Sequence, residues 1–438
     1  MRYEQIKSIL LIVLVAISVI LTFNLWTYQP KLEELKSKNT VQGVTISKTQ
    51  EEKSIVRPNK VIFHADDVHY GTINSGLISK MIDSISGWTY EEITNITQQV
   101  ENFNTFSQEN GMVEIIFPNT VPMDLYRSVL QLKDNNPPAL QFDEIVIRME
   151  VDNSHGMVYF LDTKTKNIYQ SLVPAAFITN FRSGFYNDVQ NNEKFTKYFP
   201  VTVAEQRTIY LPEQETKLMK YEYIRNEIDS AKFRDALFSD PSLVQKNFIA
   251  FGEEYSDSTS LMRVQKDQNI VSYIKPEQEN QRTSTHGILK RSIDFINDHG
   301  GWTDLYRYVE LNELRQSVRF RLYNTDGYPV FNENGLSEIG VAWGNEEIYE
   351  YKRNNFILGI QNKIGETIVP SGEEAYEMVK NIKDFNPELL QDMVIGYQMT
   401  RVASEQLVKL EPAWYFRYNN RWIILSQHEQ GGENLGLE

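Results

Sequence analysis

Cysteine is absent from the 438 residues of this chain. The protein can therefore form no disulfide, no thiolate nucleophile and no thiolate metal site, so its folded parts must be stabilised by packed cores. Positive charge is also scarce, because 44 Lys and Arg stand against 59 Asp and Glu and give a net charge of −15. An acidic surface repels phosphate, which argues against nucleic acid as a partner.

The common catalytic motifs are missing as well. No G-x-S-x-G, no H-E-x-x-H, no P-loop and no dinucleotide-binding glycine pattern occurs in the sequence. Adjacent carboxylates occur at Glu253-Glu254, Glu346-Glu347 and Glu373-Glu374, and such pairs could serve a glycosidase. Doublets are expected in so acidic a chain, so we predict no catalytic residue, no cofactor and no enzymatic activity.

Histidine is rare, with six residues, and only one pair lies close to carboxylates in the sequence. His64, Asp66, Asp67 and His69 are residue types that zinc or manganese would accept. However, His64 ends a predicted strand, whose alternate residues point to opposite faces, and the following residues are typical of a polar loop. We therefore predict no metal site here.

One long apolar run stands out near the N-terminus. Residues 8–29 carry no charge, and as one helix they would span roughly 33 Å, enough to cross a membrane. Arg2 and Lys7 precede the run, and basic flanks stay in the cytoplasm. A cleaved signal peptide needs a shorter apolar core and a small-x-small cleavage site, and neither is present. We expect a retained single-pass anchor, with the N-terminus in the cytoplasm and the bulk of the chain outside.

One face of the expected anchor helix differs from the rest. Leu11, Val15, Ser18 and Thr22 recur at intervals of four, three and four residues. Small and hydroxyl-bearing residues allow helices to approach closely and to form hydrogen bonds in lipid. We call these four residues the seam and predict that they contact another transmembrane helix, the alternative being that they are ordinary residues of a solitary anchor.

The remaining chain predicts an α+β fold in three domains. We divide the chain into a cytoplasmic stub with the anchor (1–29), a polar tether (30–57), an N-terminal domain (58–212), a central domain (213–332) and a C-terminal domain (333–438). The last two each combine a helix, a strand and an aromatic hairpin, which suggests two copies of one meander–helix–hairpin unit. Chance similarity of common α+β pieces is the alternative.

Short motifs place several elements. Capping boxes at Thr89-x-x-Glu92 and Ser371-x-x-Glu374 predict helix starts. Turn sequences at 324–327 and at Asn419-Asn420 predict hairpins. Around the second turn, aromatic residues alternate with others, so that Trp414 is expected on a buried face, although aromatic strands of this kind could also form a partner surface.

Several stretches together resemble the YycH (WalH) family: NLWTYQP at 24–30, the polar tether, RPNKVIFH at 57–64 and LEPAWYFRYNNRWIIL at 410–425. The resemblance covers essentially the whole chain in order and length. It implies a three-domain extracytoplasmic protein of Gram-positive bacteria that is anchored by one helix.

The resemblance also implies a function. Members of the family are accessory regulators of the WalK (YycG) sensor histidine kinase, which with WalR (YycF) governs cell-wall metabolism, and they act with the membrane protein YycI (WalI). Transmembrane helices carry the kinase contact in the family, and we assign that role to the seam. The alternative is an extracytoplasmic ligand-binding sensor or a cell-wall enzyme.

Overall fold

The computed structural model of the chain describes residues 46–133, 138–152, 154–279, 287–345, 347–402 and 406–425, together with Val15 and Ser18. The chain divides into two compact units, Met1–Gly43 and Val44–Glu438. Within the described residues, no helix has the length and apolar character that a membrane crossing requires. The account below concerns the second unit.

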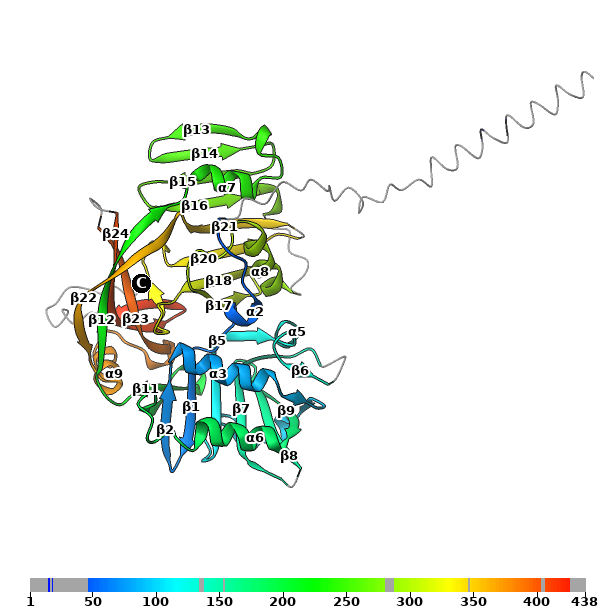
Figure 1. Ribbon diagram of the computed structural model, residues 1–438, viewed down its shortest axis with the longest axis vertical. Coiled ribbons are helices and arrows are strands. Elements are labelled where there is room, and N and C mark those ends of the chain that lie inside the picture. Colours follow the sequence, from blue (N-terminus) through cyan, green and yellow to red (C-terminus); the bar gives the residue numbers. More distant parts are fainter. Residues whose placement is uncertain are drawn as a thin grey trace, which may run out of the picture. The chain divides into compact units, whose positions relative to one another are not determined.

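A nine-stranded antiparallel sheet is built from residues 60–212, in the order β11-β10-β2-β1-β5-β7-β8-β9-β4 (Figure 1). Its strands are β1 (Lys60–Ala65), β2 (Val68–Thr72), β4 (Thr94–Asn95), β5 (Met112–Pro122), β7 (Gln141–Val151), β8 (His155–Asp162), β9 (Asn167–Pro174), β10 (Thr196–Thr202) and β11 (Thr208–Pro212).

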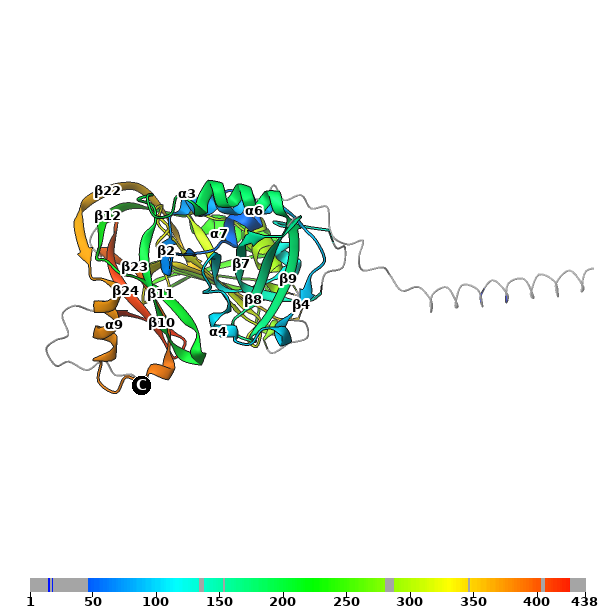
Figure 2. The ribbon, with the colours of Figure 1, turned by 90° about the horizontal axis from the view of Figure 1, so that it is seen from below.

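Both faces of this sheet are covered. Helices α3 (Ser75–Ser86) and α6 (Ala175–Phe181) lie side by side on one face (Figures 1 and 2). Helix α3 buries Ile78, Met81, Ile82 and Ile85, which recur at helical spacing. The opposite face packs against Phe103 and Phe106 of the short helix α4 (Phe103–Phe106). Smaller elements complete the region: α5 (Met123–Tyr126), the parallel pair β3 (Thr89–Tyr90) and β6 (Gln131–Leu132), and the helical turns η2 (Thr97–Gln99), η3 (Arg182–Tyr186) and η4 (Ala204–Gln206).

An eight-stranded sheet follows, in the order β13-β14-β15-β16-β21-β20-β18-β17. Helix α8 (Ile288–Asp298) buries Leu289, Ile293 and Ile296, as the helical spacing predicts, and α7 (Ser230–Leu237) buries Phe233. The strands are β13 (Gln245–Ile249), β14 (Gly252–Ser256), β15 (Leu261–Gln265), β16 (Ile270–Ile274), β17 (Tyr306–Asn312), β18 (Ser317–Leu322), β20 (Glu338–Trp343) and β21 (Ile348–Asn354), with the turns η5 (Pro241–Leu243) and η6 (Pro276–Gln278).

The third sheet has the order β19-β23-β24-β12-β22, with β25 paired to β24. Helix α9 (Gly372–Lys380) contributes Ala375 and Val379 to a core that also holds Trp414 and Phe416. The strands are β12 (Thr216–Glu227), β19 (Val330–Phe331), β22 (Phe356–Val369), β23 (Leu390–Val402), β24 (Leu407–Tyr418) and β25 (Arg421–Leu425), and η7 (Pro387–Leu389) precedes β23.

The strands of the second and third sheets cross the predicted boundary at 332/333. Strands β20 and β21 come from the predicted C-terminal domain but lie in the sheet of β15 to β18. Strand β12 comes from the predicted central domain but pairs with β22 and β24. The predicted pair of separate meander–helix–hairpin units is therefore wrong. Alternating side chains identify a strand and its buried face, but they do not specify which strand it pairs with.

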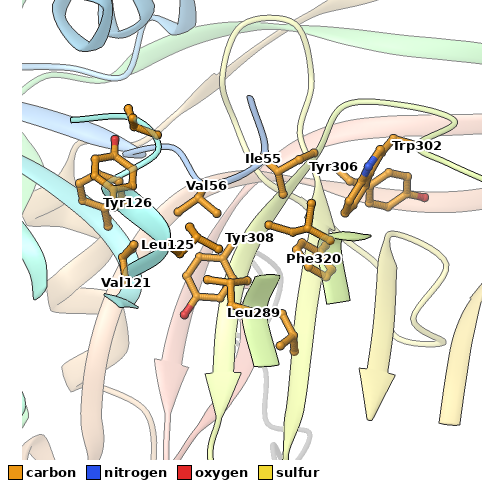
Figure 3. Close-up of a cluster of buried hydrophobic side chains, with 14 of the residues drawn as sticks. Ile55, Val56, Val121, Leu125, Tyr126, Leu289, Trp302, Tyr306, Tyr308 and Phe320 are labelled. Atoms are coloured by element: carbon orange, nitrogen blue, oxygen red, sulfur yellow. The ribbon is translucent and has the colours of Figure 1, made fainter. Parts of the chain in front are cut away.

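The last part of the predicted tether is packed against the folded region. Residues 30–45 lie outside the described residues, whereas α2 (Glu52–Ile55) leads into Ile55 and Val56, which are 2% and 0% exposed. Figure 3 shows these two side chains in one cluster with Leu125 of α5 and Tyr308 of β17. Ile55 and Val56 thus belong to the core and not to a solvated linker.

Residues 46–50 continue this attachment along α8. The Gln50 amide donates to Asn297 Oδ1 at 2.9 Å, and Asn297 Nδ2 donates to the Gln50 carbonyl at 3.1 Å. Trp302 Nε1 donates to the same Asn297 oxygen at 2.8 Å, and the Ser47 hydroxyl donates to the Trp302 carbonyl. One asparagine therefore fixes the start of the folded region to the end of a helix.

Candidate functional site

The seam lies mostly outside the described residues. Leu11 and Thr22 are not described, and Val15 and Ser18 are helical with exposed side chains. The seam remains a prediction.

The histidine motif forms a hairpin. His64 on β1 and His69 on β2 face each other in register, with their Nδ1 atoms 2.7 Å apart. Asp66 and Asp67 form the two-residue turn between them, with φ of 53° and 59°, as a primed hairpin turn requires. Among the described residues, no three His, Asp or Glu side chains converge as metal ligands.

His64 instead joins a buried polar cluster inside the first sheet. Its Nε2 lies 3.2 Å from Glu114 Oε1 on β5, and the Tyr210 hydroxyl donates to the same oxygen at 3.1 Å. Burial raises the pKa of Glu144 on β7 well above its usual range, and the charges of Glu114 and Asp143 raise it further. The nearby charge of Arg207 opposes these effects, and a cavity of about 30 Å³ beside Glu114 and Glu144 leaves space for about one water.

The adjacent carboxylates have structural roles. Glu253 is 6% exposed and pairs with Lys246 at 3.1 Å and Lys266 at 2.9 Å. Glu347 pairs with Lys275 at 3.0 Å, and Glu374 closes the capping box of α9.

A cleft with aromatic walls lies between the first and third sheets. Its volume is about 520 Å³, within the usual range for small-molecule sites. Strands β1, β2 and β10 line one side, and β12, β22, β23 and β24 line the other, with the turn at 326–329 at one end. We call it the tyrosine cleft, after its five tyrosines: Tyr198, Tyr210, Tyr221, Tyr323 and Tyr328.

Several polar contacts fix the walls of the tyrosine cleft. The Tyr221 hydroxyl donates to Asp326 Oδ2 at 2.9 Å, and burial together with this hydrogen bond raises the pKa of Tyr221. Gly327 has φ of +100°, and a Cβ there would lie 2.5 Å from the Ile73 carbonyl oxygen. Glycine at this position lets the turn approach the segment between β2 and α3 closely.

Lys60 places a cation against the aromatic wall of this cleft. Its Nζ donates to the Tyr210 carbonyl at 2.7 Å and lies 5.4 Å from the centre of the Tyr198 ring. Loss of hydration on burial lowers the pKa of this ammonium; the charges of Asp392 and Glu114 oppose the effect, and that of Arg207 adds to it. A cleft of this kind could hold an anion beside an apolar group.

A second hollow, of about 830 Å³, is lined by five arginines: Arg319, Arg321, Arg401, Arg417 and Arg421. Arg321 binds Glu338 Oε1 through both Nε (3.1 Å) and Nη2 (2.6 Å), and its guanidinium lies 4.2 Å from the centre of the Phe331 ring. The Arg321 guanidinium is therefore already bound by Glu338 within the protein, and its neighbour Trp422 also lines this hollow.

Trp414, by contrast, lies in the core. It is 2% exposed and donates its indole N–H to the Pro370 carbonyl at 2.9 Å. This confirms the predicted core position of Trp414.

Sequence reasoning missed the tyrosine cleft. Lys60 is an ordinary first residue of a strand, and the only signal of aromatic walls is the total of 24 tyrosines. The residues that line the cleft are spread from 59 to 414, so they come together only through the pairing of β12 with late strands and the packing of the third sheet beside the first.

The comparisons with known proteins agree along the chain. The family model of the YycH protein N-terminal domain matches residues 4–193, and the family model of the YycH protein C-terminal domain matches residues 206–430. The two-component system WalR/WalK regulatory protein YycH of Bacillus subtilis (strain 168) is 27% identical over 465 aligned positions, which cover 100% of both chains. The crystal structure of YycH from Bacillus subtilis superposes with a TM-score of 0.75 at 24% identity, over 87% of this chain and 99% of that chain, and shows the same mixed α+β fold.

Proposed function

Because this chain belongs to the YycH family, we propose that it regulates a WalK (YycG)-like sensor histidine kinase from the outer side of the cell membrane. In this proposal it acts together with a YycI (WalI)-like membrane protein, and its role is regulatory and not enzymatic. The observation that carries the proposal is the similarity along the entire length to a protein named as a WalR/WalK regulator.

The proposed location rests on the apolar run at 8–29 and its basic N-terminal flank. A segment of this length and composition spans a bilayer, and the basic flank favours a cytoplasmic N-terminus. The folded region after residue 46 would then lie outside the cell.

The proposed contact is between transmembrane helices, along the seam. A regulator shifts a two-state kinase only if it binds the two states unequally. A coupling free energy of about 1–3 kcal/mol changes the ratio of states about 5- to 150-fold. Small differences in the packing of Ser18 and Thr22 against a neighbouring helix are of that order, since hydrogen bonds between helices in lipid contribute about 0.6–2 kcal/mol.

The test is co-purification from membranes that contain the kinase. Ser18→Leu with Thr22→Leu removes both hydroxyls of the seam, and we expect less kinase to be recovered. Val13→Leu with Ile20→Leu is the matched control, because both positions lie on the opposite face of the helix and stay apolar. Equal recovery of kinase with both double variants would refute the seam as the contact.

A chimeric chain separates the anchor from the folded region. Residues 1–29 are replaced by an unrelated single-pass anchor of equal length, and the chain is again captured from membranes. If the anchor carries recognition, the kinase is lost. If the kinase is retained, the folded region carries recognition, and the proposal of a helix contact is wrong.

The tyrosine cleft supports a second candidate function, that of a ligand sensor. The two functions are compatible, because a regulator needs an input as well as a contact with its target. They are separable by experiment, since ligand binding is measurable on the isolated chain without a kinase.

A further inference from the structure

We infer that the tyrosine cleft is a binding site for a small anion, a carboxylate or phosphate carried on a compact apolar or ring-shaped body, with Lys60 as the residue that binds the charged group. This inference does not rest on the proposed kinase contact. It follows from the state of Lys60, from the walls of the cleft and from the charges around its mouth.

Lys60 has binding capacity to spare. An ammonium group can donate three hydrogen bonds, and within the described part of the chain Lys60 donates one, to the Tyr210 carbonyl at 2.7 Å. The described residues provide no ion pair for it, and its other contact is with the ring of Tyr198. A partly buried ammonium without a carboxylate is costly to the folded protein unless something pairs with it. A bound anion would supply that partner.

The walls of the cleft are suited to an apolar or planar body. Tyr198 is 7% exposed and Trp414 is 2% exposed, so both rings are held in place. Met219 and Met393 also line the cleft, and methionine adapts to irregular ligand shapes. A volume of about 520 Å³ admits a molecule of one or two rings, and aromatic rings contact sugars and aromatic groups alike.

The charges of the lining favour an anion. Four lysines and two carboxylates line the cleft in a chain whose net charge is −15. Asp326 already accepts from Tyr221, and Lys217 is paired with Glu366. Lys194 and Lys363 are exposed at the mouth, where they would attract an anion past an otherwise acidic surface.

The experiment uses three small probes on the purified full chain in detergent micelles: phenyl phosphate, phenylacetate and the neutral phenylacetamide. Binding is measured by saturation-transfer NMR and by calorimetry, with protein-free micelles as the blank. We expect Kd on the order of 1 mM for one or both anions, as befits ligands of this size, and weaker binding of the amide. Preference for phenyl phosphate would identify phosphate as the recognised group, and preference for phenylacetate would identify carboxylate.

Substitutions locate the site. Lys60→Met should weaken binding of the preferred anion by about tenfold or more, the usual effect of losing one charge-assisted hydrogen bond, and should leave binding of phenylacetamide unchanged. Lys60→Arg should retain much of the affinity. Lys352→Met is the matched control, because Lys352 is exposed on β21 and is not part of the cleft.

A second variant, at two exposed positions, keeps the inference testable if Lys60→Met does not fold. Lys194→Met with Lys363→Met removes charge from the mouth and should weaken anion binding about two- to threefold at low salt, with no effect at high salt. If no anion binds, or if anions bind no better than the amide, the inference is wrong. It is also wrong if folded Lys60→Met binds the anions as tightly as the unaltered chain does or, should Lys60→Met not fold, if Lys194→Met/Lys363→Met does so at low salt.

Discussion

One substitution, Asn297→Ala, should weaken the attachment of residues 46–50 to α8. The Asn297 side chain makes three hydrogen bonds, two with the Gln50 backbone at 2.9 and 3.1 Å and one with Trp302 Nε1 at 2.8 Å. The substitution removes all three. Alanine is a better helix former than asparagine, so α8 itself should not be weakened.

The size of the effect follows from those contacts. A hydrogen bond contributes about 0.5–1.5 kcal/mol net, and the two bonds to Gln50 are exposed, so we take the low end for them. With about 1 kcal/mol for the partly buried bond from Trp302, the total is about 2 kcal/mol. Local detachment of this segment should then become about 30-fold more frequent, since 1.4 kcal/mol corresponds to a factor of ten.

Hydrogen exchange measures this detachment directly. The amide of Gln50 and its neighbours in 46–50 should exchange about 30-fold faster in Asn297→Ala, while the strands of the three sheets keep their protection. Asn187→Ala is the control, because Asn187 is exposed at the end of η3 and away from this segment. An increase of less than about threefold, or an equal increase in the sheet cores, would refute the attachment that these hydrogen bonds describe.

Two further predictions concern stability. Burial acts to raise the pKa of Glu253, but hydrogen bonds from two lysines, Tyr255 and Ser230 lower it to about 2 from an ordinary 4.5. Because the folded pKa is the lower one, the stabilisation is complete above about pH 5 and is lost as the pH falls toward 2. The shift sets an upper limit of about 3 kcal/mol, and because the lysines are half-exposed we expect Glu253→Gln to cost about 2 kcal/mol at pH 7. The difference should vanish near pH 2, and a pH-independent difference in denaturant unfolding would contradict this account. Gly396→Ala would place a Cβ 2.6 Å from the Phe331 ring and should cost about 1–3 kcal/mol, whereas Gly340→Ala, with no atom within 4 Å of the new Cβ, should not destabilise the fold; equal unfolding midpoints of the two variants would refute the predicted clash.

Local motifs predicted local structure, with one instructive failure. At α9, the Ser371 hydroxyl accepts from the Glu374 amide and the Glu374 carboxylate accepts from the Ser371 amide, as the capping box requires. The similar box at 89–92 starts no helix, because β3 and β4 run through this stretch and pair with β6 and β9. Residues 89–100 contain six β-branched side chains, which favour strands over helices. The strand preference of these residues therefore outweighed the helix-start signal of the capping box.

The turns also show that nearby residues determine a turn, whereas residues far apart in the sequence decide which strands pair. Asn419 and Asn420 have φ of 45° and 63° and join β24 to β25, as predicted. The turn at 324–327 also forms, but the strand after it, β19, pairs in parallel with β23. The sequence could thus predict elements and turns, whereas the tyrosine cleft depends on which strands meet, and that is decided by packing across the whole fold.

The pairing of β12 with late strands has a consequence for synthesis. Tyr221 of β12 lies opposite Leu410 of β24, 189 residues further along the chain (410 minus 221). At roughly 5–20 residues per second, a ribosome needs about 10–40 s to make that interval. Until β22 (Phe356–Val369) has been made, both edges of β12 lack their partners, and the edge that pairs with β24 stays open for the whole interval, so β12 could pair with other chains. Nascent copies therefore depend on being kept apart until the final strands emerge, and a product that ends before residue 407 can never complete this sheet.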